Sequence, residues 1–378
     1  MILLAAALAL TPAVTRLHGF FGFVAVYAIA ATAWLVVARR ALPLRLTLAI
    51  AVVLRLPFLF DEPRLSGDVY RYLSDGRVLA GGGNPYAYTP TDPRVNHPEI
   101  RSIYPPHAQL LFAAVHDLTL WRLLIVAADL LCIVLLRRGG ALAFAACPLV
   151  IVEGTWNGHI DALAAVLLAF AFARRSSVAA GLAAGLKLIP LAAVPVLFRR
   201  RMPVVTFAAV LLLPFLPFLG GPVMPGFREY ATRWIFNSPL YDAVRLAVEL
   251  IPTKAIWTHH PLRFQLFSDF VYRHLHADFL TRAILGVAAV GAILLARRAA
   301  TAVAALLLCS PAVHPWYWLT LVPLALIERV RWTLAVALVM PLSYLLYDGV
   351  PGWVVYACSA LSVLVIRRWI PPRGDSPS

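Results

Sequence analysis

The stretch GFFGFVAVYAIAATAWLVVARR, residues 19–40, decides the fold class, because an apolar run from 19 to 38 ends in the pair Arg39-Arg40. As a helix, a run of this length crosses the hydrocarbon core of a bilayer, which is about 30 Å thick. Similar runs recur along all 378 residues, of which 61% are hydrophobic and 13% charged. Soluble proteins carry roughly 25% charged residues. The composition therefore excludes a single soluble domain and a disordered chain, and it predicts an all-α polytopic integral membrane protein.

Consecutive basic residues close six apolar runs, at 39–40, 137–138, 174–175, 199–201, 297–298 and 367–368, and favour a cytoplasmic location for those ends. The N-terminal run, Met1 to Val14, lacks the basic start of a signal peptide, so we expect it to be a retained span. We predict about 12 transmembrane helices, at 2–15, 19–38, 44–60, 119–136, 140–152, 159–173, 202–219, 279–296, 299–311, 316–327, 333–347 and 352–366.

One further apolar stretch, 177–198, has both ends next to arginines of the same expected side. Lys187 and Pro190 interrupt its middle, so we predict a re-entrant hairpin of two half-helices. Broken helices at membrane depth usually line a cavity.

The whole chain, 1–378, is predicted to form one transmembrane domain. Its parts are N-terminal helices (1–43), a first outer loop (61–118), a second outer loop (220–278) and a cytoplasmic tail (367–378). Both outer loops are too short for a separate soluble domain, and we expect short interfacial helices in them.

The charge distribution places the polar chemistry on one side. The net charge of +15 is explained by basic residues at cytoplasmic helix ends, and no nucleic-acid partner is expected. Of the 18 acidic residues, only Glu328 and Asp375 are expected in the cytoplasm, with Asp129 inside a span. The remaining acids lie on the extracytoplasmic face, which indicates an active site there.

The first outer loop carries the densest polar pattern. Ser66 is a candidate N-cap of a helix that the glycines at 81–83 end. Asp68, Arg71, Tyr72 and Asp75 are spaced i, i+3, i+4 and i+7 and share one helix face. A carboxylate near the bilayer loses hydration and becomes a stronger base, and an arginine beside it can hold a phosphate. The alternative is a set of surface ion pairs, each contributing about 0–1 kcal/mol.

This loop resembles the first outer loop of C-type glycosyltransferases, closest to bacterial polyprenyl-phosphate-mannose-dependent mannosyltransferases around glycosyltransferase family 87. The segments that carry the resemblance follow one another along the chain: Ser66-Gly67-Asp68-Val69-Tyr70-Arg71-Tyr72, Asp75-Gly76-Arg77, Asn84-Pro85-Tyr86, Asn96-His97-Pro98, Ile103-Tyr104-Pro105-Pro106, Gly158-His159-Ile160-Asp161-Ala162, Gly185-Leu186-Lys187-Leu188-Ile189-Pro190, and Ser310-Pro311-Ala312-Val313-His314-Pro315-Trp316-Tyr317.

The resemblance implies a bundle of the C-type fold in the bacterial inner membrane. It implies an inverting transfer of a hexose, with mannose as the family's sugar, from a polyprenyl-phosphate sugar to an extracytoplasmic glycan or glycolipid. Asp68 matches the general base of that family, without metal or other cofactor. Relatives often carry a second acid where this chain has Gly67. Asp61 and Glu62 are substitutes that rank behind Asp68.

Four basic or histidine side chains are expected to hold the donor phosphate: Arg71, Lys187, His314 and Arg55. A charge at the centre of the bilayer costs about 2.5–3.5 kcal/mol and needs a partner. For Lys187 the alternative partner is an acid such as Asp161, and for Arg55 it is Asp61 or Glu62. Asp129 is interpreted as a buried structural residue, with Arg122 as one candidate partner.

The remaining candidates are expected to bind the sugar or the acceptor: Tyr72, Asp75, Asn84, His97, Tyr104, Asn157, His159, Asp161, Asn237, Trp316 and Tyr317. His159 and Asp161 are alternatively a helix cap, and the aromatic residues near 316 are alternatively an interfacial belt. Arg228, Arg233, Asn237 and Tyr241 are candidates for a roof over the site. The histidines at 259, 260, 274 and 276 are interpreted as surface residues.

Two other functions stay open at this point. An O-antigen-ligase-like transferase would depend on arginine and histidine and would tolerate Asp68→Asn. A flippase or transporter of a lipid-linked sugar would need polar residues through the midplane and on both faces.

Overall fold

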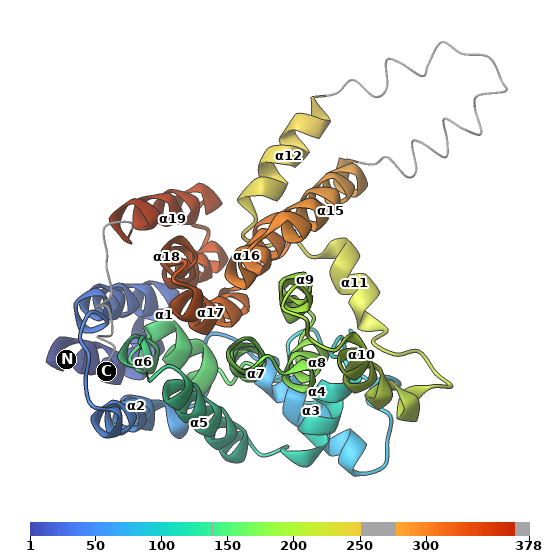
Figure 1. Ribbon diagram of the computed structural model, residues 1–378, viewed down its shortest axis with the longest axis horizontal. Helices are drawn as coiled ribbons and strands as arrows, with labels where there is room; N and C mark the ends of the chain where they lie inside the picture. Colours follow the sequence, from blue (N-terminus) through green and yellow to red (C-terminus); the bar gives the residue numbers. More distant parts are fainter. Residues whose placement is uncertain (138, 251–276, 367–378) are drawn as a thin grey trace.

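A computed structural model describes residues 1–137, 139–250 and 277–366 of the chain, and in these ranges the fold is helical (Figure 1). The first half contains α1 (Ile2–Val37), α2 (Leu44–Leu59), α3 (Asp68–Ala80), α4 (Pro106–Ala114), α5 (Leu118–Leu135), α6 (Ala141–Ala145), the π-helix η1 (Val150–Trp156), α7 (Asp161–Arg174) and α8 (Ser177–Leu186). The second half contains η2 (Ile189–Ala193), α9 (Val194–Phe198), α10 (Val204–Leu212), η3 (Leu213–Phe218), α11 (Gly226–Arg233), α12 (Pro239–Glu249), α15 (Ala277–Leu295), α16 (Ala299–Cys309), η5 (Pro315–Thr320), α17 (Leu321–Glu328), α18 (Arg331–Val339), η6 (Met340–Asp348) and α19 (Gly352–Ile366).

The all-helical prediction is confirmed for the described residues, whereas the count of about 12 spans is not. Three of the described helices, α1, α5 and α15, are long and apolar enough to cross a membrane. The pair η1 and α7, bent by 119°, provides a fourth crossing if it is counted as one span. Other expected spans divide into shorter helices at prolines; α10, for example, gives way to a 3₁₀ segment containing Pro214 and Pro217. Conversely, spans 2–15 and 19–38 join in α1, which is kinked at Gly19.

The interruption predicted in 177–198 is present at Lys187. Helix α8 ends at Leu186, and Lys187 has an extended backbone (φ −148°, ψ 140°). Pro190 then begins the 3₁₀ helix η2, which leads into α9. The break turns the Lys187 side chain out of a helical register and allows it to reach the site described below.

Helix α3 differs from the expected interfacial helix, because every residue from 69 to 76 is buried inside the bundle. It packs against α4, and a Cβ added at Gly76 would collide with the backbone carbonyl of Phe112. The helix begins at Asp68 with Gly67 as its N-cap, rather than Ser66; the Ser66 hydroxyl instead accepts a hydrogen bond from the Asp68 N–H at 3.3 Å. It ends before Gly81, as predicted.

The second outer loop contributes α11 and α12. Helices α12 and α15 run side by side and project away from the rest of the bundle (Figure 1). The remainder of this loop, with the four histidines assigned to the surface, lies outside the described residues, as does the tail 367–378.

Candidate active site

The candidate site is a cavity of about 100 Å³ at the buried N-terminal end of α3. Segments far apart in the sequence meet there: α3, the loop 96–104, the break after α8, α11 and the start of η5. Eight residues predicted from the sequence line it: Asp68, Arg71, His97, Tyr104, Lys187, His314, Trp316 and Tyr317.

Asp68 provides the carboxylate of the cavity, and its side chain keeps 24% exposure. Burial raises the pKa of Asp68 above the ordinary carboxyl value, while the charges of Lys187 and Arg71 oppose that rise. The Tyr104 hydroxyl lies 3.5 Å from Asp68 Oδ2. The alternative of an ion pair with Arg71 is not observed; Nη2 of Arg71 donates instead to the backbone carbonyls of Asn96 and His97, at 3.1 and 2.7 Å. Asp68 thus combines raised basicity with access to the cavity.

Gly67 is explained by close packing beside Asp68. A Cβ at this position would lie 2.6 Å from the Arg94 carbonyl oxygen and 2.7 Å from Asn96 Oδ1. The loop 94–96, which holds Arg71 in place, therefore occupies the space that an acidic side chain at position 67 would need.

Lys187 supplies a cation at the cavity wall. Its ammonium lies 3.2 Å from Asp161 Oδ2, 5.3 Å from the centre of the Tyr104 ring and 5.0 Å from that of Tyr317. The side chain is 13% exposed, whereas Asp161 is fully buried. The predicted alternative of pairing with Asp161 is therefore present, and the ammonium still faces the cavity.

Stacked rings form the opposite wall. His314 stacks on Trp316 at 4.4 Å between ring centres and on Phe236 at 4.6 Å. Burial lowers the pKa of His314 to about 3, and Lys187 and His97 add to this effect, so the ring is neutral at physiological pH. Among the described residues, neither ring nitrogen of His314 has a hydrogen-bond partner, which leaves both free to bind a polar ligand.

An apolar groove of about 500 Å³ adjoins the cavity. Five residues line both spaces: Ile103, Tyr104, Lys187, Tyr230 and Tyr317. Beyond them the groove is bounded by aliphatic side chains from η2, α15 and α16, among them Leu188, Leu191, Ile293, Leu306 and Leu307. The charged cavity thus opens into an elongated hydrophobic space at Lys187.

Several predicted sugar-binding residues lie one layer behind the cavity wall. Asp161 holds Lys187, and His159 is fully buried behind Asp68, 3.9 Å from its carboxylate. Tyr72 is buried, stacks on Phe112 and accepts a hydrogen bond from Tyr104 at 3.3 Å. Asn157 is also buried; its amide donates to Glu153 at 3.2 Å, and its side-chain oxygen accepts from the Leu65 N–H at 3.4 Å.

The structure places four other predicted residues away from the cavity. Arg55 pairs with Asp129 at 2.8 Å with both side chains buried, so its partner is neither Asp61 nor Glu62 and it is not available to a donor phosphate. Asp75 is buried and accepts from Gln109 at 3.0 Å. Asn84 is exposed and caps a local turn through the Tyr86 N–H. Asn237 donates to the Val313 carbonyl at 3.4 Å and lines a different, apolar pocket.

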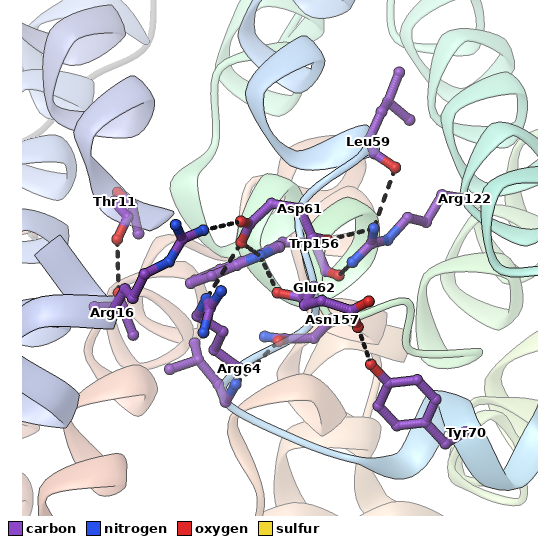
Figure 2. A network of polar contacts seen from close by, with 12 residues as sticks. Thr11, Arg16, Leu59, Asp61, Glu62, Arg64, Tyr70, Arg122, Trp156 and Asn157 are labelled. Atoms are coloured by element: carbon purple, nitrogen blue, oxygen red, sulfur yellow. Dashed lines mark hydrogen bonds and ion pairs between the residues drawn. The ribbon is translucent and has the colours of Figure 1, made fainter. Parts of the chain in front are cut away.

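Asp61 and Glu62 belong to a structural network rather than to the cavity (Figure 2). Asp61 accepts from Arg16 of α1 at 2.9 Å and from the Trp156 indole at 3.0 Å. Glu62 accepts from the Tyr70 hydroxyl, and Arg122 donates to the backbone carbonyls of Leu59, Asp61 and Trp156. These bonds tie α1, α3, α5 and η1 together. Arg122 is therefore used here, and it is not the partner of Asp129.

The roof of the cavity comes from residues that the sequence reasoning missed. Tyr230 and Trp234 line it, and the Tyr230 hydroxyl lies 2.5 Å from that of Tyr317. The predicted roof residue Arg233 instead pairs with Glu229 on the exposed face of α11, and Tyr241 donates to Asp278 at 2.9 Å. Tyr230 lies on α11, whereas Trp234 follows the end of that helix with an extended backbone (φ −81°, ψ 128°). Among the described residues, no group of three or more His, Cys, Asp or Glu side chains is placed to hold a metal ion.

Comparison with known proteins identifies the N-terminal quarter of the chain. Residues 4–104 match the family model described as alpha-(1->6)-mannopyranosyltransferase, N-terminal domain. The match contains Asp68, Arg71, His97 and Tyr104 of the cavity. Neither the curated proteins nor the solved structures contain a significant match. This match confirms the resemblance to mannosyltransferases that the sequence predicted, and the protein is a membrane glycosyltransferase.

Proposed function

We propose that the protein transfers mannose from a polyprenyl-phosphate mannose to a hydroxyl of an extracytoplasmic glycan or glycolipid, with inversion at the anomeric carbon. The observation that carries this proposal is the junction of a charged cavity and an apolar groove at Lys187. A lipid-linked sugar phosphate has the same division, with a polar sugar, one anionic phosphate and a hydrocarbon chain. The groove supports burial of the chain, worth about 25 cal/mol per Å² of apolar surface.

In this reaction Asp68 removes the proton from the acceptor hydroxyl. The acceptor oxygen bonds to the anomeric carbon as the bond between that carbon and the phosphate oxygen breaks, and the phosphate leaves with the bonding electrons. Lys187 and Arg71 face the cavity and stabilise the charge that develops on the phosphate. His314 and Trp316 offer a polar edge and an aromatic face for the sugar.

The description of the matched family adds the linkage. It names α-(1→6) transfer, so we propose the primary hydroxyl at C6 of a mannose as the acceptor group. Inversion of a β-linked donor yields this α-linkage. The concentration of the chain's acidic residues in the outer loops supports an active site on the extracytoplasmic face of a bacterial inner membrane.

The test is sugar transfer by purified protein in liposomes, with labelled polyprenyl-phosphate mannose and an extract of host lipids and glycans. Wild type is compared with Asp68→Asn and with Asp92→Asn, which makes the same change in the same loop outside the cavity. Loss of a general base lowers the rate by about 10²–10⁴-fold. We expect labelled product from wild type and Asp92→Asn only. Equal product from all three proteins would refute Asp68 as the base, and no transfer by wild type would refute the donor.

A further inference from the structure

Behind Asp68, on the side away from the cavity, lies a buried histidine followed by a buried glutamate. His159 Nδ1 is 3.9 Å from Asp68 Oδ2, and His159 Nε2 is 3.5 Å from Glu153 Oε2. The side chains of His159 and Glu153 are fully buried. The two ring nitrogens therefore face one carboxylate each, in a line that begins at the proposed base.

The local backbone holds the histidine in this position. Residues 150–156 form the π-helix η1; this geometry is rare in proteins overall, but where it occurs it is often at a functional site. Gly158 follows with φ of 71°, and a Cβ there would lie 2.9 Å from Val69 Cγ2. The Trp121 indole donates to the Gly158 carbonyl at 2.7 Å, and the His159 ring stacks on Trp316 at 4.1 Å with an interplanar angle of 11°. The ring has little freedom to turn.

The hydrogen bonds of Glu153 favour one tautomer of His159. The Tyr344 hydroxyl and the Asn157 amide both donate to Glu153 Oε2, at 3.1 and 3.2 Å. Oε2 is thus an acceptor, and the tautomer of His159 that suits it carries the proton on Nε2, 3.5 Å away, although neither ring nitrogen makes a hydrogen bond to the described residues in this structure. In a neutral imidazole the other nitrogen, Nδ1, then presents a lone pair to Asp68.

We infer that His159, oriented by Glu153, is a positioning residue that increases the basicity of Asp68. This inference rests on the proposed function of Asp68 as the base. Nδ1 has nothing to accept while Asp68 is ionised. Once the carboxylate has taken the acceptor proton, its O–H donates to Nδ1 after the two side chains close the 3.9 Å that separates them in this structure. The contact stabilises only the protonated state that forms during transfer.

The proton balance of this step is complete. The O–H bond of the acceptor breaks and an O–H bond forms on Asp68 Oδ2, where the proton stays, shared with His159 Nδ1. The negative charge leaves with the phosphate. The other charged or titratable groups near this line are Lys187, Arg71, Asp161, His314, Tyr104 and Tyr344. Lys187 and Arg71 favour ionised Asp68, and the hydrogen bond to Nδ1 opposes them.

The test is an infrared titration of the Asp68 carboxyl, because it does not require turnover. The C=O band that is absent from Asp68→Asn reports this group. His159→Phe keeps a ring to stack on Trp316 but removes both nitrogens, and Glu153→Gln keeps the shape of the glutamate. Loss of a net hydrogen bond changes proton affinity by about tenfold. We expect the midpoint to fall by about one pH unit in His159→Phe and by less in Glu153→Gln.

His314→Phe is the matched control, since it makes the same change in the same stack of rings. Its titration midpoint should equal that of wild type. In the transfer assay, His159→Phe should lower the plateau rate and move the acidic limb of kcat/KM to lower pH. A structural role would lower the plateau without moving the limb.

An unchanged infrared midpoint in His159→Phe would overturn the inference even if transfer slows. Inactive wild type would overturn the proposed function, while the infrared titration would still decide the role of His159. If His159→Phe does not fold, as judged by thermal unfolding and gel filtration, the isosteric Glu153→Gln tests the inference. An infrared midpoint of Asp68 that stays unchanged in that variant would then overturn it.

Discussion

Lys187 is the residue whose replacement most directly tests how the site binds the proposed donor phosphate. It lies at the junction of cavity and groove, and its ammonium is 3.2 Å from Asp161. Two effects of Lys187→Gln must be separated: loss of a cation next to the phosphate, and loss of the partner of a buried carboxylate. Each has its own magnitude and its own readout.

The catalytic effect follows from Coulomb's law. As the phosphate leaves, it gains one unit of negative charge. At about 4 Å and an effective dielectric of about 20, a cation stabilises that charge by about 4 kcal/mol. Because every 1.36 kcal/mol corresponds to a factor of ten in rate, the upper limit is about 10³-fold. Arg71 remains in the cavity and compensates in part, so we expect kcat to fall by about 10²-fold.

The structural effect has the size expected for breaking a buried ion pair. Removing one partner costs about 3–5 kcal/mol, and we expect about 3 kcal/mol here because Lys187 is 13% exposed. Lys187→Gln should therefore unfold at a lower temperature than wild type. The double variant Lys187→Gln/Asp161→Asn replaces the pair by two neutral amides, and it should regain most of the stability but none of the activity.

The assays are thermal unfolding in detergent and mannose transfer from a polyprenyl-phosphate mannose, run on both variants and on Lys187→Arg. The arginine variant keeps the charge and should keep part of the rate. Wild-type kcat in the stable double variant would refute the reasoning, because Lys187 would then serve only to neutralise Asp161.

Three further predictions address the packing, the base and the groove. Gly67→Ala forces a Cβ against the Arg94 carbonyl and should destabilise the protein by about 1–3 kcal/mol in thermal unfolding. The control Gly139→Ala, whose added Cβ meets no atom within 4 Å, should not destabilise it. Equal unfolding temperatures of the two variants would contradict the close packing at Gly67. Because burial raises the pKa of Asp68 and the base must be ionised, kcat/KM should fall as the pH drops through a midpoint above the ordinary carboxyl value, and an acidic limb at or below that value would contradict this assignment. Leu191→Trp narrows the groove and should raise the KM for the lipid donor about tenfold, the effect of losing about two buried methylene groups. The control Leu246→Trp, at an exposed position of α12, should leave this KM unchanged. Equal KM values for the two variants would place the lipid outside the groove.

Chemistry that a short segment carries could be predicted from the sequence. The spacing of Asp68 and Arg71 on one helix face makes both of them candidates. Lys187 is a candidate because a single lysine in an apolar stretch requires a charged or polar partner. The structure brings both to one cavity with His314, although 119 residues separate Asp68 from Lys187 and 127 separate Lys187 from His314.

What could not be predicted was the identity of distant partners. The sequence shows that Arg55 needs an anion, but only the packing of α2 against α5 selects Asp129 over the nearer Asp61 and Glu62. Likewise, periodicity assigns residues to faces of α3, but it does not reveal that the surrounding elements bury both faces. No sequence pattern around Glu153 singles it out as a candidate. A single acidic residue in an apolar run can be linked to the proposed site only when the structure shows His159 and Asp68 next to it.

The charges around the cavity explain how one proton transfer serves both parts of the proposed reaction, which are deprotonation of the acceptor hydroxyl and departure of the phosphate. Before transfer, the carboxylates Asp68 and Asp161 balance the cations Lys187 and Arg71, so the donor phosphate meets little net attraction. When Asp68 takes the acceptor proton, one of the two negative charges disappears. The attraction of Lys187 and Arg71 for the phosphate then increases at the moment when its own charge doubles. Preorganised charges of this kind stabilise the transition state more than the ground state. A neutral His159 adds to this effect, because it favours protonated Asp68 without adding a competing charge to the cavity.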